Sequence, residues 1–381
     1  MSEMRRHKSD RMIGVLSVVL MVVGLVVIYA IGPMRANYMN AAYGTHEAEN
    51  AYFVHQLISV VIAIVAFVVG FKLPYEKTRK LAIVVMVAGL VACAVLAIAA
   101  ATGNSMAVCA NGACRWLRIG GSTVSFQPAE MLKLGLVLYL AQLTAKRAEG
   151  GKLMTSDFWV PFLIMSVLSV AFVVYFQQDL GTTVVIGATI MAILLMSGVS
   201  WKIYALIVAG VVVAGVGAIF ASPHRVERLM TFTEAESADT YHIDNALLAI
   251  GTGGLTGVGV GNTVQATGYL PESINDSVFA VMGEAFGFVG LVGVLLCFLI
   301  LLSRIMRTAE RGGEREHSLV AVGMFAWMAS QVGINICAMT GLIPLTGITL
   351  PLLSYGGTSM MFTAFGLGVV AQLSGYTRRT K

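Results

Sequence analysis

The charged residues divide this sequence into long apolar stretches, and these stretches limit the folds that the chain can adopt. From Arg11 to Arg35 the sequence runs through 23 residues without a formal charge. From Glu49 to Lys72 it runs through another 22. A helix needs about 20 apolar residues to cross a bilayer, and only helices or closed barrels satisfy the backbone in lipid. Because the alternating strands of about 10 residues that form a membrane barrel are absent, the sequence predicts an all-α, polytopic membrane protein.

Composition supports this class and argues against several others. Of the 381 residues, 57% are hydrophobic and 12% are charged, whereas a soluble domain has about 25% charged residues. Five cysteines without a C-x-x-C pair argue against a disulfide scaffold and against structural zinc. The net charge of +5 has the sign that nucleic acid attracts, but the basic residues fall on one predicted membrane face. We therefore expect no nucleic-acid partner.

The division by charges predicts ten membrane-spanning helices in one membrane domain, residues 1–381. The fourth helix is unusual, because only 12 residues separate Lys133 from Lys146. Glu130 and Lys133 are therefore expected in the membrane or at its edge. The last two helices share the stretch 317–377, which carries no formal charge.

Lysine and arginine orient the helices, since these residues accumulate in cytoplasmic loops. With ten helices, one face receives 19 of them and the other receives five, and Lys133 lies within the membrane. Both termini are then cytoplasmic, with short tails of residues 1–11 and 375–381. Residues 222–276 form one large extracytoplasmic loop, and the protein is expected in the cytoplasmic membrane.

The large outer loop contains a glycine-rich run and two acids that precede the eighth helix. The run 251–261 has G-x-G spacings, but it lacks the preceding strand that a dinucleotide-binding fingerprint requires. We interpret it as flexible or closely packed backbone. Long loops are usually functional, and Glu272 and Asp276 would share one face if their segment were helical. The alternative is a pair of solvated loop acids.

Other charged residues lie near the outer end of the fourth helix. Gln127 precedes a proline that suits the first helical turn, and Glu130 and Lys133 share a face at a spacing of three. This pair forms a salt bridge, or Lys133 presents its cation to an anionic headgroup, since ionisable residues at membrane depth are often functional. Arg115 and Arg118 either bind phosphate or anchor the chain at the interface.

Polar residues at membrane depth predict a cleft that opens to the outside. Asp179 either caps the sixth helix through its first-turn amides or contacts substrate. Near the C-terminus, Pro, Gly, Ser and Thr leave backbone groups that only protein or a water-filled cavity can satisfy. The residues expected to line the cleft are Asp179, Asn335, Pro344, Ser354, Gly356, Gly357 and Ser359.

Two of the five cysteines lie close together on the predicted outer side. Cys109 and Cys114 flank an Asn-Gly pair and, in an oxidising exterior, can close a tight turn by a disulfide. Two free thiols are the alternative. Cys93, Cys297 and Cys337 fall within predicted spans, where we expect them to be packing residues.

Four motifs resemble those of the SEDS (shape, elongation, division and sporulation) family, which includes the FtsW, RodA and SpoVE types. The run from Asn335 to Ser359 is similar to the family signature almost position for position. The other three fall in family order: Arg115-Trp116 with Gln127-Pro-Ala-Glu-x-x-Lys133, then Gln177-x-Asp179-Leu-Gly181, then Leu270-Pro-Glu272-x-x-x-Asp276. The resemblance covers essentially the whole chain.

This resemblance implies a peptidoglycan glycosyltransferase that polymerises lipid II into glycan strands on the outer face of the membrane. Asp276 would then be the general base, and Glu272 would support it or tune its pKa. The residues implied for the pyrophosphate headgroup are Arg115, Arg118, Lys133, Glu130 and Gln127. No cofactor is certain; a divalent cation could supplement these groups, but the sequence shows no dedicated cluster of ligands.

The chain departs from the family pattern at several positions. Gln178 replaces a usual proline, and Ile274-Asn-Asp-Ser277 replaces His-Thr-Asp-Phe. Tyr241-His242 stands where the family usually has Tyr-Gln, and Gly283-Glu-Ala285 where it has Gly-Glu-Glu. Asp276 itself is retained, so the sequence is that of a divergent member. The run Gly347-Ile-Thr-Leu-Pro351 is more similar to the division type than to the elongation type.

Other functions and a partner are also considered. The alternatives are an elongation-type polymerase, a lipid II flippase or transporter without chemistry, and a structural scaffold. Members of the family resemble one another in working beside a class B penicillin-binding protein transpeptidase, among the membrane proteins of division or elongation. A contact surface rich in small residues is expected, with Gly287, Gly290, Gly293 and Gly323 as candidates.

Overall fold

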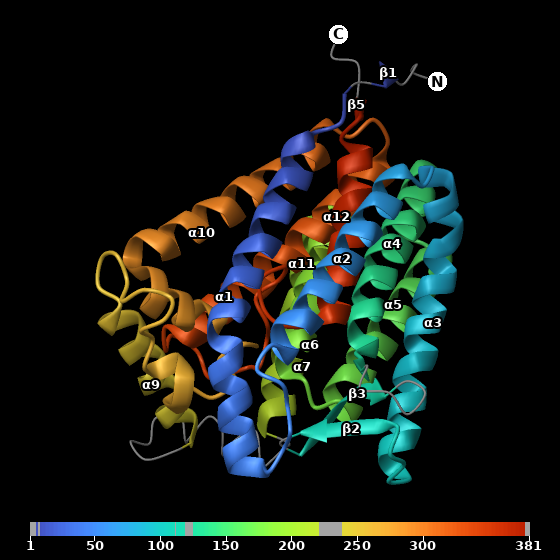
Figure 1. Cartoon of the computed structure of the whole chain (residues 1–381). Helices are drawn as coiled ribbons and strands as arrows, with labels where there is room; N and C mark the ends of the chain where they lie inside the picture. The colour runs from blue at the N-terminus through green and yellow to red at the C-terminus, as the bar shows by residue number, and fades with distance from the viewer. Residues whose placement is uncertain (1–4, 7, 111, 119–124, 221–237, 378–381) are drawn as a thin grey trace.

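The computed structural model describes residues 5–6, 8–110, 112–118, 125–220 and 238–377. These residues are mostly helical, and most of the helices run side by side along one axis (Figure 1). The α-helices are α1 (Arg11–Tyr43), α2 (Ala51–Lys72), α3 (Tyr75–Ala101), α4 (Pro128–Glu149), α5 (Ser156–Ala171), α6 (Leu180–Met196), α7 (Trp201–Phe220), α9 (Ala238–Thr252), α10 (Val278–Arg311), α11 (Arg315–Met339) and α12 (Gly357–Leu373). Two π-helical turns, η1 (Phe172–Phe176) and η2 (Gln265–Tyr269), complete the helical part.

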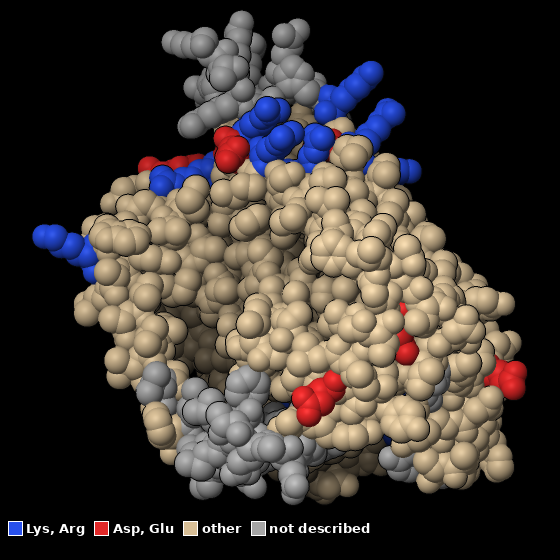
Figure 2. All heavy atoms as spheres, turned by 90° about the vertical axis from the view of Figure 1, so that its left-hand side faces the viewer, with Lys and Arg blue, Asp and Glu red and all other residues tan. Residues whose placement is uncertain are grey.

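Several helices expose apolar side chains, as lipid-facing helices do. Val61 and Val65 on α2, and Val84 on α3, are each more than half exposed. Within the described residues, six helices are long and apolar enough to cross a membrane, and three further apolar helices are shorter. Lys and Arg gather at the end of the bundle where the ends of the chain lie (Figure 2). This arrangement agrees with the sequence prediction of a helical membrane protein.

Helix α4 differs from its neighbours because it lies inside the bundle. Fourteen of its 22 residues are buried, and it packs against α3, α5, α6, α11 and α12. Glu130 and Lys133 are each only 3% exposed. The two charges therefore face protein and not lipid, which explains how a helix with such a short charge-free stretch can occupy the centre of the fold.

Helix α10 is broken at Gly287, and the glycine-rich run fills the break. Gly287 has a φ of 65° and a ψ of −165°, outside the helical region. On one side of the break, Val258 N–H donates to the Glu284 carbonyl at 2.9 Å. On the other side, Phe288 N–H donates to the Gly254 carbonyl at 2.9 Å. The run 251–261 is thus closely packed backbone, one of the two forms expected from its composition, and it satisfies the groups that the broken helix frees.

A buried carboxylate fastens the next part of the outer segment to α10. The side chain of Glu284 is enclosed by the protein and accepts hydrogen bonds from three consecutive backbone amides, those of Val264, Gln265 and Ala266. These amides begin η2, which also packs against α1. Residues 253–269 therefore fold back on the first half of α10.

The segment between α11 and α12, residues 340–356, is not helical although it lies among helices. Several of its apolar side chains are buried, including Ile348, Leu350 and Leu353, whereas Leu342 is exposed. The hydroxyl of Ser354 accepts a hydrogen bond from the Leu350 amide at 2.8 Å. Buried irregular backbone needs such internal partners, and the Pro, Gly, Ser and Thr residues that the sequence concentrates here form this segment.

Small β-sheets add to the predicted all-α fold. Strands β2 (Ala107–Ala110), β3 (Ala113–Arg118) and β4 (Ser125–Phe126) form an antiparallel sheet, and β1 (Arg5–Arg6) pairs with β5 (Tyr376–Thr377). Strands of two to six residues at the ends of the bundle give no alternating pattern long enough to predict. The β2–β3 hairpin contains the Cys109–Cys114 disulfide, which confirms the disulfide and excludes the free thiols.

The structure also limits two other predictions. Of the predicted outer loop, residues 238–276 are described as α9, η2 and the turns around them, while 221–237 lie outside the described residues, as do parts of both predicted tails. Gly287 and Gly323 are buried inside the protein, so they are unsuited to a contact with a partner. Gly290 is only partly buried and Gly293 is exposed on α10.

We predict that Gly257→Ala destabilises the fold. Gly257 has a φ of +81°, and an added Cβ would lie inside the van der Waals radius of the Ala285 carbonyl. Strain and overpacking of this kind cost about 2 to 4 kcal/mol together. Thermal unfolding of the purified protein in detergent measures the loss.

The matched control is Gly261→Ala in the same run. Nothing lies within 4 Å of an added Cβ there, and the backbone of Gly261 does not have a positive φ. An equal loss of stability in both variants would mean that the packing of the run on α10 is not what requires glycine.

Candidate active site

Asp276 lies on a short series of turns immediately before α10. The turns are held by the Ser277 hydroxyl, which donates to the Pro271 carbonyl at 2.9 Å, and by the Asn275 amide, which donates to the Glu272 carbonyl at 2.9 Å. Glu272 has a φ of 49°, so the segment is not the helix that would place both carboxylates on one face. The turns nevertheless keep Glu272 close enough to act on Asp276 electrostatically.

The carboxyl of Asp276 is buried, and its environment favours the protonated form. Its side chain is 7% exposed, and the Oδ1 atom has no hydrogen-bond partner among the described residues. Burial is the largest cause that raises the pKa of Asp276 to about 7, and the negative charge of Glu272 is the next. Hydrogen bonds from Ser277 act in the opposite direction. A carboxyl with a pKa near neutrality is suited to accept a proton in general base catalysis.

Asn335 on α11 joins the Asp276 segment to the irregular segment 340–356. Its amide group donates to two carbonyls, those of Asp276 and Ile348, both at 2.7 Å. A third connection is made by the Tyr355 amide, which donates to the Ile274 carbonyl at 2.9 Å. The position of Asp276 is therefore set by α11 and by the segment before α12, as well as by its own turns.

Two of the departures from the family pattern contact each other beside Asp276. His242 on α9 and Ser277 form a hydrogen bond between Nε2 and Oγ at 2.6 Å, and both side chains are buried. Neither residue is among the site residues predicted from the sequence. The sequence signal that could have identified them is that both depart from the family pattern, which has Gln in place of His242 and Phe in place of Ser277.

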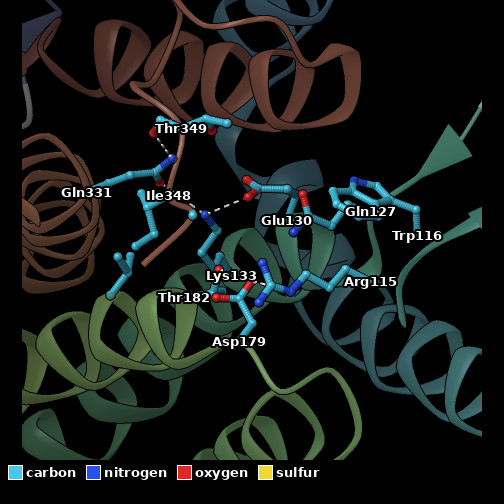
Figure 3. Close-up of a pocket in the computed structure, with 12 residues that line it drawn as sticks. Arg115, Trp116, Gln127, Glu130, Lys133, Asp179, Thr182, Gln331, Ile348 and Thr349 are labelled. Carbon is cyan, nitrogen blue, oxygen red and sulfur yellow. Dashed lines mark hydrogen bonds and ion pairs between the residues drawn. The ribbon is translucent and has the colours of Figure 1, made fainter. Parts of the chain in front are cut away.

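Two of the three predicted cations, Arg115 and Lys133, line a pocket beside strand β3 together with their partners (Figure 3). The pocket has a volume of about 50 Å³, which is room for a few water molecules. Its lining residues are Arg115, Trp116, Gln127, Glu130, Lys133, Asp179, Thr182, Val185, Gln331, Gly347, Ile348 and Thr349.

Lys133 is enclosed by partners on α4 and α11. Its Nζ atom lies 2.8 Å from Glu130 Oε1 and donates to Gln331 Oε1 at 3.1 Å. It also lies 4.8 Å from the centroid of the Trp327 ring. The predicted salt bridge is thus present. Gln331 and Trp327 were not predicted, because they lie almost 200 residues further along the chain and only the fold brings them to Lys133.

Arg115 reaches from β3 to the junction of η1 and α6. Its Nη2 atom donates to the Gln178 carbonyl at 3.2 Å, and its Nε atom lies 3.9 Å from Asp179 Oδ2. Asp179 also caps α6, since its Oδ1 atom accepts from the Thr182 amide at 2.9 Å. With two cations and two carboxylates among its lining residues, the pocket has charges that balance one another.

The remaining predicted residues lie outside this pocket. Arg118 is exposed on β3. Six others belong to the Asp276 side or to the start of α12: Asn335, Pro344, Ser354, Gly356, Gly357 and Ser359. Ile348 lines the pocket while its carbonyl accepts from Asn335, so Asn335 is the link between the pocket and Asp276. Among the described residues, no group of three or more His, Cys, Asp or Glu side chains could hold a metal ion.

Comparisons with known proteins give one family throughout. Residues 10–379 match the model of the FtsW/RodA/SpoVE family, described as cell cycle proteins. The probable peptidoglycan glycosyltransferase FtsW of Halomonas elongata is 31% identical over 99% of this chain and 93% of its own length. The stage V sporulation protein E of Bacillus subtilis is 31% identical over 98% of this chain and 99% of its own.

Solved structures show the same fold. The rod shape determining protein RodA of Thermus thermophilus aligns with a TM-score of 0.64 and 25% identity, over 96% of each chain. A chain from a peptidoglycan synthase complex that coordinates polymerization and crosslinking aligns with a TM-score of 0.74 and 22% identity, over 96% of this chain and 97% of that one. The chain is accordingly an integral membrane protein.

We predict that replacing either Glu130 or Lys133 alone destabilises the protein more than replacing both. Removing one partner leaves a buried charge without compensation, which costs about 3 to 5 kcal/mol, whereas replacing both is far less costly. Glu130→Gln and Lys133→Met should each lower the thermal unfolding midpoint more than the double substitution does. Effects that simply add in the double variant would contradict this coupling.

Proposed function

We propose that this chain, which belongs to the FtsW/RodA/SpoVE family, is a peptidoglycan glycosyltransferase that polymerises lipid II into glycan strands. The observation that carries the proposal is the buried carboxyl of Asp276, with a pKa raised to about 7, at the end of the outer segment. It occupies the aspartate position of the Leu270-Pro-Glu-x-x-x-Asp motif. Relatives named as probable peptidoglycan glycosyltransferases match over nearly the full chain.

We place the protein in the cytoplasmic membrane as a single domain, residues 1–381, with ten spans. The spans are α1 to α7 and α10 to α12, with the buried charges of α4 shielded by the other helices. The gathering of Lys and Arg at the end that holds β1 and β5 (Figure 2) supports cytoplasmic tails at 1–11 and 375–381. The loop 222–276, the hairpin and Asp276 are then extracytoplasmic.

The proposed reaction needs a base that accepts the proton of the attacking hydroxyl and cations that stabilise the departing pyrophosphate. The 4-hydroxyl of an N-acetylglucosamine attacks the anomeric carbon of a muramic sugar that is linked to polyprenyl pyrophosphate. As the new glycosidic bond forms, Asp276 accepts the hydroxyl proton, and the bond to the pyrophosphate breaks. Cations that stabilise the departing pyrophosphate lower the barrier further.

Arg115 and Lys133 are placed differently for stabilising the departing pyrophosphate. The side chain of Arg115 is 17% exposed, so its guanidinium is the cation of the pocket that a headgroup outside can reach. The side chain of Lys133 is only 3% exposed, and its positive charge balances the negative charge of Glu130. Arg118 is exposed beside the hairpin and offers a further positive charge to an approaching anion. Figure 2 shows a hollow in the face formed by α9 and α10, which would allow a lipid-linked substrate to approach from the side.

A septal role and a transpeptidase partner complete the proposal. Several of the similar relatives are FtsW proteins, and the Gly347-Ile-Thr-Leu-Pro351 run favours the division type over an elongation-type polymerase. The similar chain from a complex that coordinates polymerization and crosslinking supports a class B penicillin-binding protein as partner, within the divisome or elongasome. Gly290 and Gly293 remain available on α10 for such a contact.

The rival function is a flippase that moves lipid II without chemistry. Against it, the charged pocket and Asp276 lie toward one end of the bundle, whereas alternating access needs polar groups near the midplane. Purified protein with fluorescent lipid II distinguishes the two. Polymer formed without ATP or a partner identifies the enzyme, and transfer between leaflets without polymer identifies the flippase.

We predict that Asp276→Asn abolishes polymerisation while the protein still folds. The substitution keeps the size of the side chain but removes the base, a loss of about 100-fold or more. Arg115→Ala should weaken substrate binding, so a higher lipid II concentration should partly restore its rate but not that of Asp276→Asn. Initial rates with fluorescent lipid II measure this. A near wild-type rate for Asp276→Asn would place the base elsewhere.

We also predict a pH dependence set by Asp276 and Glu272. Asp276 is a base only when ionised, and its pKa is about 7, so the rate should rise with pH through neutrality. Glu272→Gln removes a negative charge that raises this pKa, and the midpoint of the profile should move to lower pH. Asp244→Asn, which removes an exposed carboxylate on α9, is the control and should leave the midpoint in place. Equal profiles for all three proteins would exclude Glu272 as the cause.

A further inference from the structure

The Cys109–Cys114 disulfide lies directly beside a residue of the charged pocket. Cys114 immediately precedes Arg115 on β3, and Cys109 lies opposite it on β2. Arg115 and the next residue, Trp116, both line the pocket (Figure 3). The disulfide and Arg115, the more accessible cation of the pocket, are therefore neighbours along the same strand.

The backbone pairing of the hairpin is irregular at the point where the disulfide closes it. The register between β2 and β3 shifts between Val108 and Cys109. Such a bulge disrupts the hydrogen-bond ladder locally, and short hairpins are only marginally stable on their own. The covalent bond therefore maintains the strand pairing next to Arg115 where the ladder alone is weakest.

Arg115 in turn depends on this strand for its direction. Its guanidinium contacts the Gln177 and Gln178 carbonyls and faces Asp179, all on a junction more than 60 residues away in sequence. Gln178 has a φ of 49°, so its carbonyl is directed by an uncommon backbone conformation. The long arginine side chain must start from a fixed point to make these contacts and still present an edge to the outside.

We propose that the Cys109–Cys114 disulfide is a positioning element for Arg115, which it holds ready to receive the pyrophosphate of the lipid-linked substrate. This inference rests on the proposed function. A preformed site does not lose conformational freedom when the anion binds. Opening the disulfide leaves the catalytic base in place but lets Arg115 take other directions, so substrate binding weakens while the chemical step is retained.

The test uses the full-length protein in detergent, with and without dithiothreitol, and the Cys109→Ala/Cys114→Ala double variant. Reduction transfers two electrons and two protons from the dithiol, which becomes a cyclic disulfide, and yields two cysteine thiols. For the reduced wild type and the double variant, KM for lipid II should rise about 5- to 10-fold with kcat within about 2-fold. Dithiothreitol should not raise the KM of the double variant further. In Cys297→Ala, the control variant, dithiothreitol should raise KM as it does in the wild type.

A binding measurement separates this inference from the proposed function. Affinity for undecaprenyl pyrophosphate should fall by a similar factor on reduction, with the thermal unfolding midpoint of the helical bundle unchanged. Oxidised wild type that binds this lipid but makes no polymer would refute the proposed function. The difference in affinity between oxidised and reduced protein would still show whether the disulfide positions Arg115. Unchanged KM and affinity, or a fall in kcat and thermal midpoint together, would overturn the positioning role.

Discussion

The structure depends on one constraint: buried backbone groups that a broken helix or an irregular segment frees must find partners within the protein. Helix α10 breaks at Gly287, and the run around Gly257 supplies the missing partners on both sides of the break. The segment 340–356 is irregular, and side chains such as Asn335 and Ser354 bond its backbone. Gly347, Ile348 and Thr349 of this segment line the charged pocket, and Asn335 bonds both this segment and the Asp276 carbonyl. Because the segment needs partners from distant elements, it ties those elements together at the candidate site.

The same constraint governs the charges of α4. A buried cation is costly unless it is paired, and Lys133 is surrounded by Glu130, Gln331 and the Trp327 ring. Such a pair contributes little net stability but is costly to break. Lys133 is thus enclosed, whereas the Arg115 side chain is 17% exposed and is the more accessible of the two cations that line the pocket.

Sequence patterns predict those features that neighbours along the chain determine. The charge-free stretches locate the long helices, the spacing of Glu130 and Lys133 predicts their ion pair, and Asp179 caps the helix that follows it. Features determined by distant segments are not predictable in this way. Glu272 adopts a positive φ within turns held by Ser277 instead of a helix, and Gly287 is covered by the outer segment and not by a partner. Gln331 reaches Lys133 only because α11 packs on α4.

His242 and Ser277, which both depart from the family pattern beside Asp276, are best understood together. A phenylalanine at position 277 would offer no hydroxyl to the residue at position 242. In this chain His242 and Ser277 bond to each other, and Ser277 also closes the turn on the Pro271 carbonyl. Hydrogen bonds from Ser277 lower the pKa of Asp276 against the effects of burial and Glu272. The polar pair thus supports the turns that carry Asp276 through hydrogen bonds, and the carboxyl has a pKa of about 7, at which it can accept a proton near neutral pH.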